Sequence, residues 1–203
     1  KKAIKYCEIA NLRFIGEKRT SLFDRINEIV AQTDFSDGDG LDSLYRFIEL
    51  LVRYGHYRQA RSHILRNMDK WEGSLRNKAY FRLAWLDGFK LDFPEEARWT
   101  FSRLVRTAPT NWEKARARYY LALFKNKTEE DYDLINGLLE VSKKFPQTHY
   151  GSASARRAFE ERTRGADLST LDNQLESFKS ALSRSAVREA TWKLFYLSFS
   201  DGN

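Results

Sequence analysis

The chain is poor in the residues that mark several classes of protein. A single cysteine, Cys7, excludes an internal disulfide framework. Three prolines and ten glycines in 203 residues are few for an all-β protein, because its many tight turns need both residue types. The longest apolar candidate, residues 44–52, is interrupted by Arg46 and Glu49 and is far shorter than the roughly 20 apolar residues of a membrane span. We therefore expect helices and no transmembrane segment.

The charge balance is basic but mixed. The formal net charge is +7 and the pI is about 9.4, which suits an anionic partner such as nucleic acid or an acidic polymer. Acidic residues interleave with basic ones along almost the whole sequence, which is typical of a solvated surface of mixed charge. Nucleic acid is therefore the least favoured of the partners considered.

The strongest pattern is an internal repeat of about 37 residues. The joint Phe145-Pro146-Gln147-Thr148 matches the joint Ala108-Pro109-Thr110 at that spacing. Two sets of upstream apolar residues fall in the same register: Ala60, Ala97 and Leu134, and then Ile64, Phe101 and Leu138. Each set lies on the second helix of a pair, and one pair alone cannot bury its apolar stripe. The pattern predicts an all-α fold, a right-handed α-solenoid of stacked antiparallel helix pairs.

The predicted solenoid is one continuous superhelical domain with three segments. Residues 1–40 hold a helix pair, expected at 3–15 and 20–32, and a loop follows over 33–41. Residues 41–165 hold the repeats and residues 166–203 a last helix pair, which makes about ten or eleven helices. The apolar stripe expected on the helix at 20–32 consists of Phe23, Ile26, Ile29 and Val30.

Helix ends are expected where stop and start signals occur. Tyr54-Gly55 is expected to close one helix and Phe93-Pro94 to open another, while Thr128 to Asp131 form a capped first turn. At the last joint Gly151 is expected at the N-cap, with Ser152 and Ser154 bonding the first-turn amides.

The last joint has two interpretations. In the favoured one it is a structural hinge between helix pairs, and the Tyr150 ring packs near Val141 or Phe145. In the alternative, His149 and Tyr150 belong to a ligand surface.

Trp85 and Tyr120 lie on apolar stripes and are assigned to the core.

Helix pairs of this length that end in a proline joint are similar to the tetratricopeptide repeat class. The segments Ala115-Arg116-Ala117-Arg118-Tyr119-Tyr120-Leu121 and His149-Tyr150-Gly151 further resemble the superhelical, non-catalytic region of soluble lytic murein transglycosylases. The resemblance implies a soluble protein of the periplasm or cell envelope, a scaffold that binds a protein or a peptidoglycan-like polymer. The alternative is the non-catalytic part of a peptidoglycan-cleaving enzyme whose catalytic domain lies outside this chain. The partner and the oligomeric state stay open.

No pattern in the chain predicts catalysis, a metal or a cofactor. Glu176-Ser177 could begin a transglycosylase catalytic domain, but no Gly-Leu-Met-Gln segment follows it, and Leu175 continues a helical stripe instead. The stretch Asp37 to Gly40 invites a calcium-loop interpretation, but with Gly40 at the sixth position Phe35 is first and Arg46 twelfth, where carboxylates are needed. His56 and His63 could share a helical face, but zinc needs further ligands. We therefore expect a non-enzymatic chain.

Five residues are the candidates for partner binding: Arg61, Arg66, Arg98, Trp99 and Arg103. Arg61 and Arg66 recur at Arg98 and Arg103 at the repeat spacing, which would stack them into a basic stripe. Trp99 lies off the apolar stripe, beside the arginines. It could stack on a sugar ring or a base, although packing against a neighbouring helix is the favoured interpretation.

Overall fold

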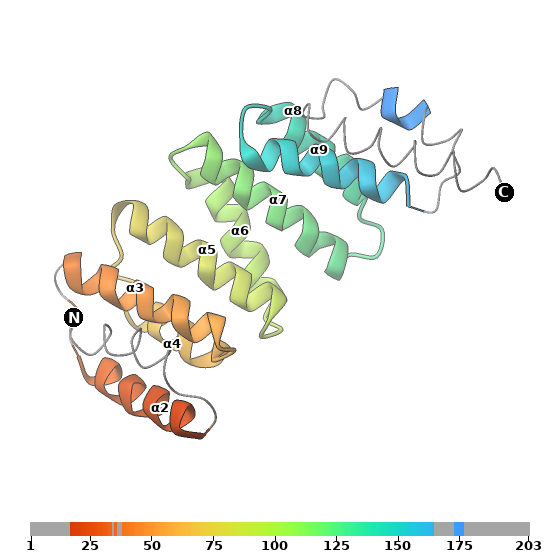
Figure 1. The fold of residues 1–203 in the computed structure, drawn as a ribbon. Helices are drawn as coiled ribbons and strands as arrows, with labels where there is room; N and C mark the ends of the chain where they lie inside the picture. Colours follow the sequence, from red (N-terminus) through yellow and green to blue (C-terminus); the bar gives the residue numbers. More distant parts are fainter. Residues whose placement is uncertain (1–16, 34, 36–37, 165–172, 177–203) are drawn as a thin grey trace. The chain divides into compact units, whose positions relative to one another are not determined.

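The computed structural model describes residues 17–33, 35, 38–164 and 173–176 (Figure 1). Within these residues the longer elements are eight α-helices, and there is no strand. They are α2 (Glu17–Gln32), α3 (Gly38–Arg53), α4 (Tyr57–Arg66), α5 (Gly73–Phe89), α6 (Pro94–Thr107), α7 (Asn111–Thr128), α8 (Leu134–Lys144) and α9 (His149–Arg162). The predicted all-α class is confirmed for this part of the chain. The helix expected at 3–15 and nearly all of the last pair lie outside it.

The chain divides into two compact units, residues 1–97 and 98–203, and helix α6 crosses the boundary. Consecutive helices pack on one another within each unit: α3 on α4 and α4 on α5 in the first, and α7 on α8 and α8 on α9 in the second. Helix α7 also contacts α9. The stacking of pairs into a solenoid stays a prediction, and so does the division at residues 40 and 165.

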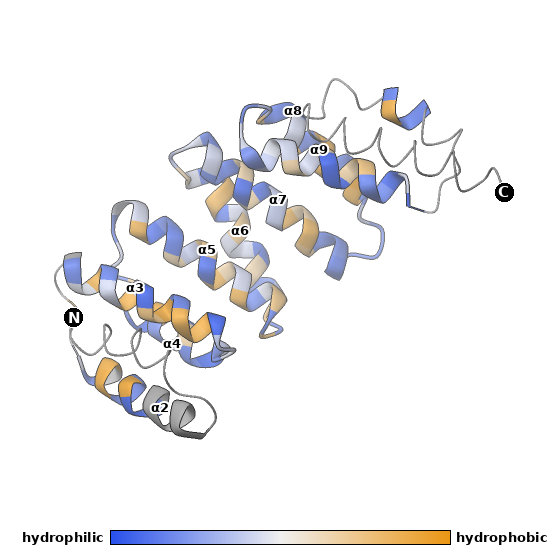
Figure 2. Cartoon of the chain, in the orientation of Figure 1, coloured by the Kyte–Doolittle hydropathy of each residue, from blue (hydrophilic) through white to orange (hydrophobic). Residues whose placement is uncertain are grey.

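The first unit has a core built from α2, α3, α4 and α5. Its fully buried members include Leu44, Ile48, Ile64 and Leu86. Trp71 is fully buried too, and its indole N–H donates to the Ile64 carbonyl oxygen at 3.0 Å. Figure 2 shows the apolar and polar residues interleaved along the helices, as their amphipathic periodicity predicts.

A buried histidine connects α2 to α4 in the first unit. The His63 Nε2 atom lies 2.6 Å from Asn27 Oδ1, and the ring packs edge-on against Phe47. Because Asn27 Oδ1 only accepts, the proton of the neutral ring lies on Nε2.

The predicted stripe of α2 is confirmed at Ile26 and Val30, but it is wrong at Ile29, whose side chain is 46% exposed.

The second unit has a core between α7, α8 and α9. Ala122, Leu138, Ala155 and Ala158 are its most buried residues, and Phe159 packs with them. The small alanine side chains let α9 approach its neighbours closely. Leu175 joins the same core, while the other residues of its predicted stripe lie outside the described part of the chain.

Several predicted helix ends are confirmed and others are wrong. Helix α3 ends at Arg53, before Gly55 with its positive φ of 83°, and α6 begins at Pro94. The loop predicted over residues 33–41 is shorter, because α3 already begins at Gly38. Residues 128–131 do not open a helix, since α7 ends at Thr128 and the N-cap of α8 is Asp133, whose carboxylate accepts from the Asn136 N–H.

Candidate functional site

A tight joint between α8 and α9 positions the candidate site in the second unit. Thr148 is the N-cap of α9, and its hydroxyl oxygen accepts from the Gly151 N–H at 2.9 Å. The same hydroxyl donates to the Phe145 carbonyl oxygen, also at 2.9 Å. One side chain therefore bonds both the end of one helix and the start of the next, which fixes the direction of Tyr150.

Gly151 occupies a position where no larger residue fits. A Cβ atom there would lie 1.9 Å from the Phe145 carbonyl oxygen, which belongs to the backbone and cannot turn aside. The predictions for this turn are therefore wrong in two respects. Gly151 is in the first turn and not at the N-cap, and the Ser154 hydroxyl donates to the Tyr150 carbonyl oxygen at 2.6 Å rather than serving a first-turn amide.

Five aromatic side chains meet at this joint, and we call them the Tyr150 cluster: Trp112, Tyr119, Tyr120, His149 and Tyr150. The Tyr150 ring centroid lies 5.6 Å from that of Trp112, 5.7 Å from Tyr119 and 6.1 Å from Tyr120. The three α7 members are spaced as i, i+7 and i+8 and so share one helix face. The Tyr150 ring also packs on Val141 and Phe145, which confirms the predicted packing.

Two rings of the cluster, those of Trp112 and His149, are exposed. Trp112 is 44% exposed, whereas the three tyrosines are half-buried. Burial raises the pKa of Tyr150, with Tyr120 adding to the rise and Arg116 opposing it. Burial likewise raises the pKa of Tyr119. Both hydroxyls therefore keep their protons at neutral pH and can donate hydrogen bonds.

An arginine accompanies the exposed ring of the cluster. The Arg116 guanidinium carbon lies 4.6 Å from the Trp112 ring centroid, one helical turn further along α7. Attraction between a cation and a π face holds the guanidinium beside the ring. The sequence interpretation missed Trp112 and Arg116 as a pair, and it assigned Tyr120 to the core although that side chain is only half-buried.

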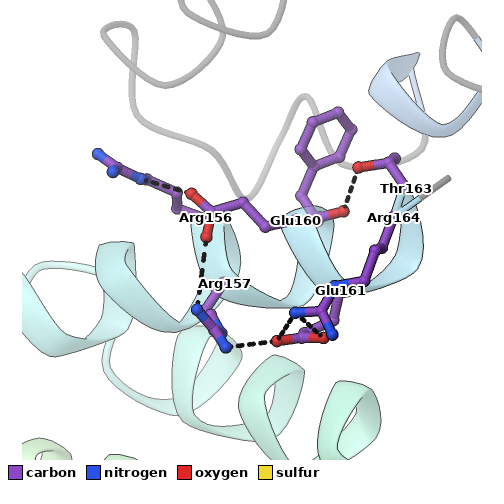
Figure 3. A network of polar contacts seen from close by, with 7 residues as sticks. Arg156, Arg157, Glu160, Glu161, Thr163 and Arg164 are labelled. Atoms are coloured by element: carbon purple, nitrogen blue, oxygen red, sulfur yellow. Dashed lines mark hydrogen bonds and ion pairs between the residues drawn. The ribbon is translucent and has the colours of Figure 1, made fainter.

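Acidic and basic side chains pair with one another along α9 (Figure 3). Arg156 Nε lies 3.0 Å from Glu160 Oε1, and Arg157 Nη2 lies 2.6 Å from Glu161 Oε1. Arg164 also pairs with Glu161, at 2.8 Å. The charges on this stretch are thus largely balanced by their neighbours, and the mixed charge inferred from the sequence is confirmed for α9.

The candidate residues of the first unit have different surroundings. Arg61 Nε lies 2.7 Å from Asp87 Oδ1, a side chain only 1% exposed, and the guanidinium also stacks on the Phe93 ring at 4.3 Å. Burial raises the pKa of Asp87, and Arg61 opposes that rise. These contacts give Arg61 a structural role. Arg66 is exposed in the last turn of α4, and partner binding by either arginine stays a prediction.

The remaining candidates lie on the part of α6 that belongs to the second unit. Trp99 is 59% exposed, and the Arg103 guanidinium carbon lies 5.4 Å from its ring centroid. The favoured interpretation, that Trp99 packs against a neighbouring helix, stays a prediction. Arg98 is exposed beside it. Because Arg61 and Arg66 lie in the other unit, the continuous basic stripe stays a prediction.

The third tryptophan with a neighbouring cation, Trp85 of the first unit, is half-buried. Arg82 lies 5.4 Å from its ring centroid but is bound through two hydrogen bonds to Glu49, at 2.8 and 2.5 Å. Lys90 lies near the rings of both Trp85 and Tyr57. This arrangement connects α3, α4 and α5, which is a structural role.

Among the described residues, no three histidine, cysteine or acidic side chains gather in a way that could hold a metal ion. His63 bonds Asn27 instead, and Cys7 lies outside the described part. In the same part of the chain, none of the helices is both long and apolar enough to cross a membrane.

No known protein family, curated protein or solved structure matches the chain.

Proposed function

We propose that the chain is a non-enzymatic helical-repeat scaffold that binds a protein or polymer partner through the Tyr150 cluster. One observation carries the proposal: a tryptophan 44% exposed contacts Tyr150, the residue at the centre of the aromatic cluster, and lies beside an arginine. Tryptophan, tyrosine and arginine dominate the residues that supply most binding energy at interfaces.

The cluster is organised before any partner arrives. The Tyr150 ring contacts four other rings, and the Thr148 cap and the close approach at Gly151 fix its backbone. A rigid surface loses little conformational entropy on binding, so more of the contact energy appears as affinity. This rigidity supports a binding role for the joint and equally a role as a structural hinge. Substitution of Trp112 distinguishes the two roles, because only a binding role predicts that the substitution weakens partner binding.

Capture experiments test this proposal. Immobilised wild-type protein, Trp112→Ala and the surface control Lys143→Ala are exposed to a cell-envelope extract and, separately, to peptidoglycan sacculi. Any captured protein is then purified and its affinity for each variant measured. We expect Trp112→Ala to lose the partner while Lys143→Ala keeps it, with melting temperatures close to that of the wild type. If every partner binds both variants equally, the cluster is structural and the proposal falls.

The second candidate is the non-catalytic region of a peptidoglycan-cleaving enzyme. What favours it is that the Tyr150 cluster draws on the two segments that resemble the transglycosylase superhelical region, Ala115 to Leu121 and His149 to Gly151. The gene sequence downstream of Asn203 decides this candidate, because a lysozyme-like domain is either encoded there or not. Scaffold binding through the cluster is compatible with either result.

A further inference from the structure

Three rings of the Tyr150 cluster contact one another in sequence, and we call them the aromatic row: Trp112, Tyr150 and Tyr119. Trp112 and Tyr119 lie seven residues apart on α7, so they share one face of the helix and are about 10 Å apart along its axis. The Tyr150 ring bridges them, with centroid distances of 5.6 Å to Trp112 and 5.7 Å to Tyr119. These contacts place the three rings side by side within the second unit.

The aromatic row carries hydrogen-bond donors that the protein itself does not use. Within the described part of the chain, the Trp112 indole N–H and the hydroxyls of Tyr119 and Tyr150 have no hydrogen-bond partner. Neither hydroxyl is among the buried polar atoms, so both reach water, and Trp112 is 44% exposed. Burial of the rings raises the pKa of both tyrosines, so the hydroxyls keep their protons and donate at neutral pH.

The carboxylates near the row are already engaged. Glu113, in the first turn of α7, accepts from the Thr110 hydroxyl at 2.8 Å. Glu160, whose charge acts on Tyr119, pairs with Arg156 at 3.0 Å. The surface therefore offers apolar rings and donors but few free acceptors. A sugar suits it poorly, because each sugar hydroxyl donates a hydrogen bond as well as accepting one.

The arginines near the row do not favour a phosphate polymer. Arg157 of α9 pairs with Glu161 at 2.6 Å, which balances its charge locally. The Arg116 guanidinium lies over the Trp112 ring at 4.6 Å, and its Nε atom is buried. Binding of a nucleic acid depends on cations that neutralise its phosphates, and these two arginines are committed to the protein's own contacts.

A proline-rich segment fits both the donors and the spacing of the rings. Proline has no N–H, so a run of prolines presents carbonyl acceptors and apolar rings without backbone donors. Such a run forms the polyproline II helix, in which every third residue returns to the same side after about 9 Å. That repeat is close to the separation of about 10 Å between Trp112 and Tyr119 along α7. The helix is also preformed, so little entropy is lost on binding.

We propose that the aromatic row is a docking site for a proline-rich segment in the polyproline II conformation. Two prolines three positions apart pack on Trp112 and Tyr119, with Tyr150 between them. The indole N–H and the two hydroxyls donate to carbonyl oxygens of the segment. This inference rests on the proposed function, because it names the chemistry of the partner that the Tyr150 cluster binds.

Fluorescence anisotropy of labelled peptides tests the inference. Decaproline is compared with a glycine–serine decapeptide, and unlabelled cellohexaose and oligothymidylate are added as competitors. We expect decaproline to bind at least about tenfold more tightly than the flexible peptide, and neither competitor to displace it. Among alanine-based peptides, one with a proline at every third position should bind more tightly than one with a proline at every fourth.

Variants separate the rings from their donors. Trp112→Ala should weaken decaproline binding at least about tenfold, as truncation of a dominant interface aromatic does. Tyr119→Phe with Tyr150→Phe keeps both rings and removes two donors, so the affinity should fall about threefold to tenfold. Lys143→Ala, on the exposed face of α8, should change nothing. Melting temperatures close to that of the wild type check that each variant folds.

Equal binding of the two decapeptides, full affinity of Trp112→Ala or of the double tyrosine variant, or displacement by either competitor would each overturn the inference. A protein captured in a Trp112-dependent manner that decaproline does not displace would overturn the proline-rich ligand alone and leave the scaffold proposal standing. The absence of any Trp112-dependent partner, decaproline included, would remove both.

Discussion

Two glycines in comparable helical positions face different neighbours. A Cβ at Gly151 would meet the Phe145 carbonyl oxygen at 1.9 Å, whereas a Cβ at Gly137 would meet the Tyr132 hydroxyl at 2.0 Å. Both distances are too short for real atoms. A backbone carbonyl inside a hydrogen-bonded joint cannot move without breaking the joint, while a tyrosine hydroxyl is the far end of a side chain that can rotate.

Gly151→Ala should therefore lower the free energy of unfolding by about 1 to 3 kcal/mol, the usual cost of forcing extra atoms into a packed site. Gly137→Ala should be neutral or stabilising by up to about 1 kcal/mol, because alanine favours the helix over glycine. Urea denaturation of both variants measures the difference. Equal effects of the two substitutions would show that the Phe145 carbonyl can give way.

His63 should make stability depend on pH. Burial lowers its pKa from 6.5 to about 4, and the charge of Arg66 contributes second. Because the folded value lies below the unfolded one, the stabilisation is fully present above pH 6.5 and is lost as the pH falls to about 4. The loss should be about 3 kcal/mol across that window.

Denaturation of the wild type and of His63→Gln at matched pH values isolates this contribution. Carboxylates titrate in the same range, so the quantity to compare is the difference between the two proteins. The glutamine side chain of the variant does not titrate, so the variant should give the shallower dependence. Parallel curves would mean that the imidazole is free to take up a proton in the folded state.

At the scale of elements, the ion pair between Arg61 of α4 and Asp87 of α5 should matter more than its partly exposed position suggests. Arg61→Ala leaves a carboxylate that is 1% exposed without its countercharge, which should cost about 3 kcal/mol, the low end for broken buried pairs. The exposed Arg66→Ala should cost under about 0.5 kcal/mol. Thermal melting compares the two. Similar small effects of the two substitutions would show that the Arg61–Asp87 ion pair contributes little to stability.

Apolar periodicity predicted the elements well because it reflects local sequence. Ile64, Phe101 and Leu138, placed in register from the sequence, are all fully buried. Helix caps were harder to predict, because several residues compete for each one. Thr148 rather than Gly151 caps α9, and that choice depends on where the Phe145 carbonyl lies once α8 has ended.

The candidate site could be predicted only in part, because some of its contacts depend on how the helices pack and not on local sequence. Trp99 was singled out because it lies off its helix stripe, a feature that the sequence shows directly. Trp112 was missed because it meets Tyr150 only through the packing of α7 against the start of α9, a contact between residues almost 40 positions apart that no local pattern shows. The repeated Trp-x-x-x-Arg spacing was the one signal in the sequence that could have singled out Trp112.

At the scale of the whole molecule, the chain should be predominantly helical in solution. The described residues contain no strand, and the sequence outside them predicts helices at 3–15 and within 166–203 from the same apolar periodicity. A circular dichroism spectrum of the full chain should therefore show more helix than α2 to α9 alone account for. A substantial strand signal would contradict the predicted class for the remaining residues.

The joint at Phe145 to Gly151 also constrains how this sequence can diverge. Position 151 admits glycine alone, since every other residue adds a Cβ against the Phe145 carbonyl oxygen. Position 148 admits threonine, serine or another side chain that can cap a helix. Position 137 carries no such limit. Distant relatives of this chain should therefore share the spacing of a capping residue three positions before an invariant glycine, even where the rest of the sequence has drifted beyond recognition.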